Sequence, residues 1–218
     1  MSYKTNFIDF MLACEALKFG SFTTKSGRQT PYFVNTGAYD TGNMVRRLGQ
    51  FYAEALCSLD GVEFDNLYGP AYKGIPLVVT TSIAMEASHE RDVTFTFNRK
   101  EAKDHGEGGN LVGYKYRGGE KVVIVEDVMT AGTSIHESVP IIKAAAPDVE
   151  IVGIMISVDR QEQGPNGRAA SAEILEKYGI PVFSIVSLSE VVEYLGGNGT
   201  LSSDQLDAIA AYREQWGA

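Results

Sequence analysis

Long apolar runs and export signals are both missing from this sequence of 218 residues. No stretch approaches the roughly 18 consecutive apolar residues that a membrane-spanning helix needs. The first residues, MSYKTNFIDF, lack the basic region and apolar core of a secretory signal. These absences predict a cytoplasmic protein without a membrane partner.

Cysteine is also scarce, with one thiol at Cys14 and one at Cys57. Neither belongs to a CxxC pair, and the sequence has no His/Cys spacing typical of a metal site. Since both stand in segments with helical periodicity, we expect buried, reduced thiols rather than a disulfide.

Positive charge is the third scarcity, because 19 Lys and Arg face 28 Asp and Glu and leave a net charge of −9. A nucleic-acid-binding protein needs a basic face, so we expect no nucleic acid partner. The hydrophobic fraction of 44% is ordinary for a soluble globule. A chain of this length buries about 70% of its unfolded surface and can hold its own core.

The most informative stretch that is present runs from Lys121 to Ser134, KVVIVEDVMTAGTS. Its four apolar residues, 122–125, do not alternate with polar ones, which predicts a strand covered on both faces of a parallel sheet. Glu126 and Asp127 then stand at the carboxyl end of this strand, the edge where open α/β sheets bind ligands. The next helix, expected from about Thr133, points unpaired N–H groups at an anion.

The polar residues of this turn narrow the ligand. Thr130, Thr133 and Ser134 supply three hydroxyl groups beside Gly132. Two adjacent carboxylates repel each other unless hydroxyls, a cation or a metal lie between them. A strand, turn and helix start can also be an ordinary connection that binds nothing, but this combination favours a sugar phosphate.

The remaining periodicities predict alternating helices and strands, an α/β class. Thr41 is the expected N-cap of its helix, and Pro140 the expected kink of another. Helices are expected at 5–18, 41–59, 75–87, 135–146, 169–178, 188–195 and 203–215. Strands are expected as a pair within 21–35 and at 65–68, 93–97, 111–116, 121–125, 149–158 and 182–186, with 117–120 as a hairpin turn joining 111–116 to 121–125.

Two further segments carry candidate anion ligands. In GPAYKGIP (69–76), glycines and backbone amides would cradle a phosphate beside Lys73. Residues 99–110 have no apolar side chain larger than Ala102, so burial cannot order them, and they fit a cationic lid over a polyanion. Because acids are interspersed, a solvated loop is the alternative. The lid candidates are Arg99, Lys100, Lys103 and His105.

Isolated basic residues elsewhere are open to two interpretations. Lys25 and Arg28 flank a glycine turn, and Arg160 follows the strand 149–158. Taken alone, each is typical of a solvated surface. Arg160, however, would reach the same sheet edge as Asp127.

The turn at 126–134, two acids followed after two residues by T-x-G-T/S, resembles the phosphoribosyl-diphosphate motif of the type I phosphoribosyltransferases. Four other segments, at 25–35, 69–77, 97–113 and 157–164, resemble successive motifs of bacterial orotate phosphoribosyltransferases in the same order. Glu126 departs from the pattern, since those relatives usually carry Asp there. The chain therefore resembles the bacterial orotate phosphoribosyltransferases.

The resemblance implies one phosphoribosyltransferase domain over 1–218, with a central parallel sheet flanked by helices, a hood at about 1–40 and a lid at about 99–119. It implies a reaction of orotate with phosphoribosyl diphosphate, giving orotidine 5′-monophosphate and pyrophosphate in pyrimidine synthesis. It further implies Mg²⁺ as cofactor without dedicated protein ligands, and a homodimer in which each lid closes over the neighbouring subunit's site.

The resemblance also assigns residues. Lys103, Glu126 and Asp127 are the expected catalytic residues. Phosphoribosyl diphosphate is assigned to Lys25, Tyr72, Lys73, Arg99, Lys100, Lys103, His105, Glu126, Asp127, Val128, Met129, Thr130, Ala131, Gly132, Thr133 and Ser134. Orotate is assigned to Lys25, Phe33, Val34, Thr130 and Arg160.

Two alternatives fit less well. A regulator that senses phosphoribosyl diphosphate and binds nucleic acid would lose the lid lysines and gain a basic domain, the reverse of this sequence. A purine-specific phosphoribosyltransferase is disfavoured by Arg160 and the KSGR segment.

Overall fold

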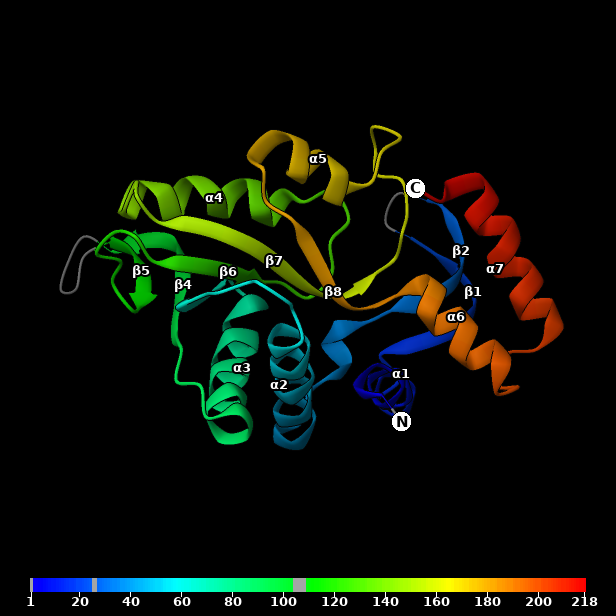
Figure 1. Ribbon diagram of the computed structural model, residues 1–218. Helices are drawn as coiled ribbons and strands as arrows, with labels where there is room; N and C mark the ends of the chain where they lie inside the picture. Colours follow the sequence, from blue (N-terminus) through cyan, green and yellow to red (C-terminus); the bar gives the residue numbers. More distant parts are fainter. Residues whose placement is uncertain (1, 25–26, 104–108) are drawn as a thin grey trace.

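The computed structural model describes residues 2–24, 27–103 and 109–218, and side chains within these ranges except at 102, 103 and 109. It is a three-layer α/β structure, with a twisted sheet between α4 and α5 on one face and α2 and α3 on the other (Figure 1). The helices are α1 (Tyr3–Ala13), η1 (Thr36–Ala38), α2 (Gly42–Cys57), α3 (Gly74–His89), α4 (Thr133–Ala145), α5 (Ala170–Tyr178), α6 (Leu188–Gly197) and α7 (Ser203–Trp216). The strands are β1 (Leu17–Thr23), β2 (Gln29–Val34), β3 (Asn66–Gly69), β4 (Thr94–Lys103), β5 (Gly109–Gly113), β6 (Lys121–Val125), β7 (Glu150–Asp159) and β8 (Val182–Ser187).

The main sheet has the order β5-β4-β3-β6-β7-β8, and every neighbouring pair is parallel except β4 and β5. The predicted α/β class with a central parallel sheet is confirmed. The carboxyl ends of β3, β6 and β7 therefore meet at one edge, which brings the segments after residues 69, 125 and 159 together.

Strand β6 shows why an uninterrupted apolar run forms the middle of such a sheet. Val122 and Ile124 pack with α4 and α5 in one core cluster. Val123 and Val125 pack with α1, α2 and α3 in the other. All four are fully buried, so neither face of the strand tolerates a polar residue.

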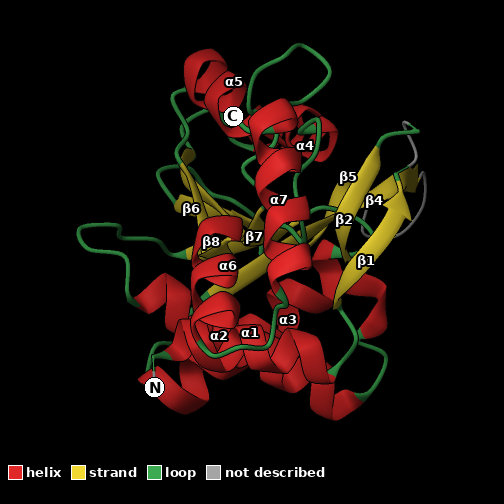
Figure 2. Ribbon diagram, turned by 90° about the vertical axis from the view of Figure 1, so that its right-hand side faces the viewer, coloured by secondary structure: helices red, strands yellow, loops and turns green. Residues whose placement is uncertain are grey.

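A smaller antiparallel sheet of β1 and β2 lies at the β8 end of the molecule, beside α6 and α7 (Figure 2). The predicted strand pair within 21–35 is confirmed, although β1 begins earlier. Leu17 belongs to β1, so the predicted extension of the first helix to residue 18 was wrong. The helix ends at Ala13, and Glu15 follows with a φ of 54° that breaks the helical path.

Two caps and one kink candidate agree with local sequence rules. The hydroxyl of Thr41 accepts a hydrogen bond from the Met44 amide at 3.2 Å and caps α2, as predicted. Gly132 caps α4 with a φ of 67°, a left-handed conformation that favours glycine. Pro140 lies inside α4 as expected.

Strand β5 does not form the predicted hairpin with 121–125. It pairs with β4, and β4 and β3 separate it from β6. The prediction failed because β6, apolar on both faces, belongs in the sheet interior, whereas GNLVG fits an edge. Residues 99–103, predicted as loop, extend β4.

The thiols are free, as expected, but Cys57 is exposed and Cys14 only half-buried, so the prediction of two buried thiols was wrong. No helix in the part of the chain that the structure describes is long and apolar enough to cross a membrane.

Candidate active site

The end of β6 is fixed from two neighbouring elements. The hydroxyl of Tyr52, on α2, donates to the carbonyl oxygen of Glu126 at 2.7 Å. The Ser157 hydroxyl, on β7, donates to the carbonyl oxygen of Asp127 at 2.6 Å. The backbone that carries both acids is thus held before any ligand binds, which reduces the ordering that catalysis would require.

The Asp127 carboxylate is the best-connected polar group at this edge. One oxygen accepts from the Thr36 hydroxyl at 2.6 Å and from Lys73 Nζ at 2.7 Å. The other accepts from the Val128 amide at 2.7 Å. Burial opposes ionisation of Asp127, but hydrogen bonds from Lys73, from Thr36 and from the backbone outweigh it and hold the pKa of Asp127 below its usual value.

Glu126 has a different environment. It is 6% exposed, and its carboxylate accepts from the amide of Asp127 at 3.0 Å. Burial raises the pKa of Glu126 to about 7, and a hydrogen bond with Ser134 offsets this only in part. Close to neutral pH, Asp127 therefore carries the dependable negative charge of the pair.

The start of α4 is the part of the turn where the sequence predicts anion binding. Its N-cap residue is Gly132, which has no side chain to accept hydrogen bonds from the amides of the first turn. Helix N-termini of this kind bind phosphate groups. This geometry suits the predicted phosphate loop.

The turn after β3 brings Lys73 to the site. A Cβ on Gly69 would meet the carbonyl oxygen of Gly74 at 2.3 Å, and one on Gly74 would meet Gly69 at 2.8 Å, so only two glycines allow so tight a turn. Close by, Tyr72 is 68% exposed and Lys100 Nζ lies 5.3 Å from its ring centroid.

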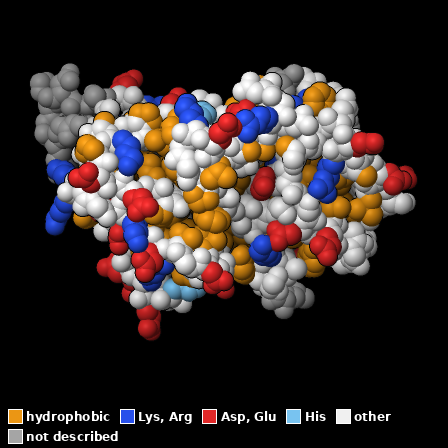
Figure 3. Space-filling model, turned by 45° about the horizontal axis from the view of Figure 1, so that its top comes forward, with side chains coloured by type: hydrophobic (Ala, Val, Ile, Leu, Met, Phe, Trp, Pro, Cys, Tyr) orange, Lys and Arg blue, Asp and Glu red, His pale blue; other side chains and the backbone are white. Residues whose placement is uncertain are grey.

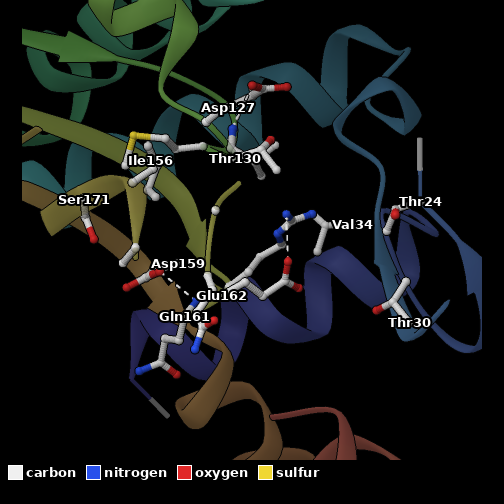
Figure 4. A pocket seen from close by; sticks show the side chains of 18 of the residues that line it. Thr24, Thr30, Val34, Asp127, Thr130, Ile156, Asp159, Gln161, Glu162 and Ser171 are labelled. Carbon is white, nitrogen blue, oxygen red and sulfur yellow. Dashed lines mark hydrogen bonds and ion pairs between the residues drawn. The ribbon is translucent and has the colours of Figure 1, made fainter. Parts of the chain in front are cut away.

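A cavity of about 670 Å³ extends from Asp127 to the loop after β7. In Figure 4, Asp127 and Thr130 face it from the turn after β6, Val34 from β2, Asp159 from the end of β7 and Glu162 from the loop after β7. Of the residues predicted for the site, it is lined by Phe33, Val34, Lys73, Asp127, Val128, Met129, Thr130, Ala131 and Arg160.

Arg160 points from the end of β7 to this cavity, and its Nη2 lies 3.0 Å from the Glu162 carboxylate. Phe33, 42% exposed, supplies an apolar wall. An apolar surface beside a guanidinium suits a flat, acidic heterocycle.

Other predicted residues fall elsewhere. Glu126 is buried beneath the turn, and Gly132, Thr133 and Ser134 lie at the start of α4 rather than in the cavity wall. Arg99 and Lys100 are on β4. Lys25, His105 and the Lys103 side chain lie outside the described residues.

Sequence reasoning missed several residues that shape the cavity. Arg28 was flagged only as flanking a turn, and Tyr32, Thr36 and Glu162 were not singled out. Glu162 stands two residues after Arg160, and this spacing is the one signal by which it could have been found. Thr36 meets Asp127 across 91 positions, and no local pattern encodes such a contact.

The surface and the side-chain inventory bear on partners. Figure 3 shows acidic and basic side chains interspersed over one face rather than a continuous basic patch. Among the described side chains, no group of three or more His, Cys, Asp or Glu could hold a metal ion.

Known proteins resemble this chain over its full length. A family model described as the phosphoribosyl transferase domain matches residues 35–185. An orotate phosphoribosyltransferase of Clostridium beijerinckii is 54% identical over 222 residues, covering 100% of this chain and 99% of that protein. Its counterpart in Cronobacter sakazakii is 51% identical, with 99% and 98% covered.

A solved structure agrees. The crystal structure of an orotate phosphoribosyltransferase of Francisella tularensis matches with a TM-score of 0.87 at 36% identity, covering 98% of this chain and 100% of that one. The family expected from the motifs is confirmed: the chain belongs to the orotate phosphoribosyltransferases.

Proposed function

We propose that the cavity between Asp127 and Arg160 binds phosphoribosyl diphosphate and orotate and transfers the phosphoribosyl group to the orotate ring nitrogen, releasing pyrophosphate. The observation that carries this proposal is the placement of an ionised carboxylate and a guanidinium at the ends of two neighbouring parallel strands, β6 and β7, on one cavity. The first suits a ribose diol and developing positive charge, and the second suits an acid.

The ribose phosphate would occupy the turn after β6. Asp127, assisted by Glu126, accepts hydrogen bonds from the ribose hydroxyls and stabilises positive charge that develops on the ring as the bond to pyrophosphate breaks. The backbone of 129–134 and the start of α4 receive the 5′-phosphate.

The diphosphate would lie toward the turn after β3. Lys73 pairs with Asp127 at 2.7 Å in this structure and is 64% exposed, so it can turn from this partner to the leaving group. Arg99, Lys100, Lys103 and His105 complete the cationic set as the family resemblance implies. These charges act most strongly when pyrophosphate leaves, which lowers the barrier rather than only tightening binding.

The carboxylate at this turn suits a Mg²⁺ ion that enters bound to the diphosphate of the substrate. Mg²⁺ is usually held by one or two carboxylates together with substrate phosphates and water, and the turn after β6 presents one carboxylate, Asp127, to the cavity. When bound, Mg²⁺ would neutralise part of the diphosphate charge. Asp127 keeps its role as acceptor for the ribose hydroxyls.

Replacing Arg160 tests the orotate end of the cavity. Arg160→Ala should raise KM for orotate roughly 30- to 150-fold, because a charge-assisted bidentate contact contributes on the order of 2 to 3 kcal/mol. KM for phosphoribosyl diphosphate should change far less. Steady-state kinetics with each substrate varied in turn measures both values, and an equal rise in both would place Arg160 outside the orotate subsite.

We also propose a cytoplasmic homodimer with shared sites. Unpaired thiols at Cys14 and Cys57 are typical of a reducing compartment. The β4–β5 hairpin lies at the sheet edge farthest from β8, a position from which a lid can reach a neighbouring subunit across a two-fold axis.

Subunit mixing tests the shared site. If Lys103 acts on substrate held by the partner's Asp127, Lys103→Ala and Asp127→Ala chains, each inactive alone, form hybrid dimers with one intact site. Random pairing makes about half the dimers hybrid, so roughly a quarter of wild-type activity should return. Failure to recover activity, with hybrids confirmed by native mass spectrometry, would show that each lid serves its own chain.

A further inference from the structure

Glu162 gathers three groups of the orotate end of the cavity around one carboxylate that is 10% exposed. One oxygen lies 3.0 Å from Arg160 Nη2 and 3.8 Å from Arg28 Nη1. The other accepts a hydrogen bond from the Tyr32 hydroxyl. Burial and the nearby Glu162 charge raise the pKa of Tyr32, so the phenol stays a neutral donor.

This ion pair fixes how the Arg160 guanidinium is turned. Its Nε is buried and has no hydrogen-bond partner among the described residues, which costs free energy. Since Nε contacts no acceptor there, the ion pair with Glu162 is what orients the Arg160 guanidinium. Whatever holds Glu162 and its loop in place also sets the aim of Arg160.

The C-terminal end of the chain holds that loop. The Gln163 amide donates to the Trp216 carbonyl oxygen at 2.8 Å, and its side chain donates to the Gly217 carbonyl oxygen at 2.8 Å. The Ala218 amide donates to the Gln161 carbonyl oxygen at 3.0 Å. Figure 1 shows the C-terminus beside the loop after β7.

The Trp216 side chain reaches the same cluster by a second route. The Arg28 guanidinium lies 4.2 Å from the centroid of the Trp216 ring, a cation–π distance. Arg28 also donates to the Gln163 carbonyl oxygen at 3.4 Å. Trp216 itself is absent from the cavity wall, so it can act on a ligand only through these neighbours.

Three residues of this cluster, Arg28, Tyr32 and Trp216, lie outside the domain that the wider phosphoribosyltransferase family shares. The phosphoribosyl transferase model matches 35–185, whereas Arg28 and Tyr32 precede this range and Trp216 follows it. The shared domain contains the turn after β6. The N-terminal flanking segment contacts the carboxylate that orients Arg160, and the C-terminal one contacts Arg28 and Gln163.

We propose that Trp216 is a positioning residue for the acceptor substrate: through Arg28 and the loop of Glu162 it orients Arg160, and so sets the affinity for the carboxylate of orotate. The inference rests on the proposed function, because it takes Arg160 as the orotate ligand. It adds a role for the C-terminal end of α7, which lies outside the range that the phosphoribosyl transferase model matches.

Kinetics of Trp216 variants test it. Trp216→Ala should raise KM for orotate about five- to tenfold, because the cation–π contact and the aim of Arg160 are lost together. Trp216→Leu, which keeps an apolar side chain without the ring, should do the same and replaces the alanine variant if that one does not fold. Trp216→Phe, which restores a ring, should stay within about twofold of wild type. kcat and KM for phosphoribosyl diphosphate should stay within about twofold in all three.

Two comparisons separate positioning from general destabilisation. Leu206→Ala truncates another half-buried residue of α7, which packs on the core away from the loop, and should leave KM for orotate unchanged. In an Arg160→Ala background, Trp216→Ala should add less than about a twofold change, because the group that it positions is gone. An unchanged KM for orotate in Trp216→Leu, a parallel rise in both KM values, or a full additive effect without Arg160 would overturn the proposal.

The outcomes also separate this inference from the proposed function. If Arg160→Ala raises KM for orotate selectively but the Trp216 variants do not, the orotate subsite stands and the role of Trp216 falls. If Arg160→Ala has no selective effect, the assignment of the subsite fails first, whatever the Trp216 variants do.

Discussion

Lys103→Ala is expected to lower kcat by about two orders of magnitude or more while the protein stays folded. The reason is electrostatic, since the partner of Lys103 in the proposed mechanism is a leaving group whose charge grows in the transition state. Lys103 is the last residue of β4, where its backbone pairs with Gly109. Pre-steady-state measurement of the chemical step, with melting temperature as the folding check, gives the result.

A matched variant controls for loss of one positive charge. Lys177→Ala, at an exposed position on α5, should leave kcat unchanged. Near-normal kcat in Lys103→Ala would remove the lid lysine from catalysis, while an equal loss in both variants would point to net charge rather than position.

Asp127→Asn is expected to have the second large effect, which is a fall in kcat on the order of 100-fold. The change preserves the shape of the side chain and removes the charge that faces the ribose in the proposed mechanism. The melting temperature should move little, because asparagine keeps an oxygen that can accept from the Val128 amide, and the Lys73 partner is 64% exposed and can turn to water. A large loss of melting temperature with preserved kcat would show that Asp127 is structural.

The neighbouring acid serves as the comparison. Burial raises the pKa of Glu126 to about 7, so this carboxyl is only partly ionised at neutral pH and Glu126→Gln removes less charge than Asp127→Asn. The loss of kcat in Glu126→Gln should therefore be the smaller one. A larger loss than at Asp127 would reverse the roles of the two acids.

Much of the parallel sheet could be predicted from sequence because burial on both faces leaves a local signature. The run 122–125 is apolar throughout, and it became β6, with two residues in each of two core clusters. The end of that run also located the two acids and the turn before α4, since strand, turn and helix start are consecutive in the chain.

The edge of the sheet could not be predicted in the same way. Residues 111–116 and 121–125 are close in sequence, and a glycine turn between them suggested a hairpin. Strand order depends on which faces each strand buries, a competition among distant segments that no local pattern reveals. Cys57 illustrates the same limit, because helical periodicity alone did not show that its side chain is exposed.

The acceptor end of the site was the hardest to foresee. Arg28, Glu162 and Trp216 come from segments separated by more than fifty residues, and they meet only because the β1–β2 sheet and α7 fold against the loop after β7. Motifs identify residues that act together within one turn, and they do not identify side chains that orient one another across the fold.

Loss of orotate absorbance in the presence of phosphoribosyl diphosphate and Mg²⁺ is the most direct measurement of the central claim, that the cavity between Asp127 and Arg160 joins these two substrates. Wild-type protein should consume orotate only when both other components are present, with one pyrophosphate released per orotate lost. Asp127→Asn and Arg160→Ala should slow the reaction through kcat and through KM for orotate, respectively. No consumption of orotate by folded wild-type protein, or consumption that neither substitution affects, would contradict the account.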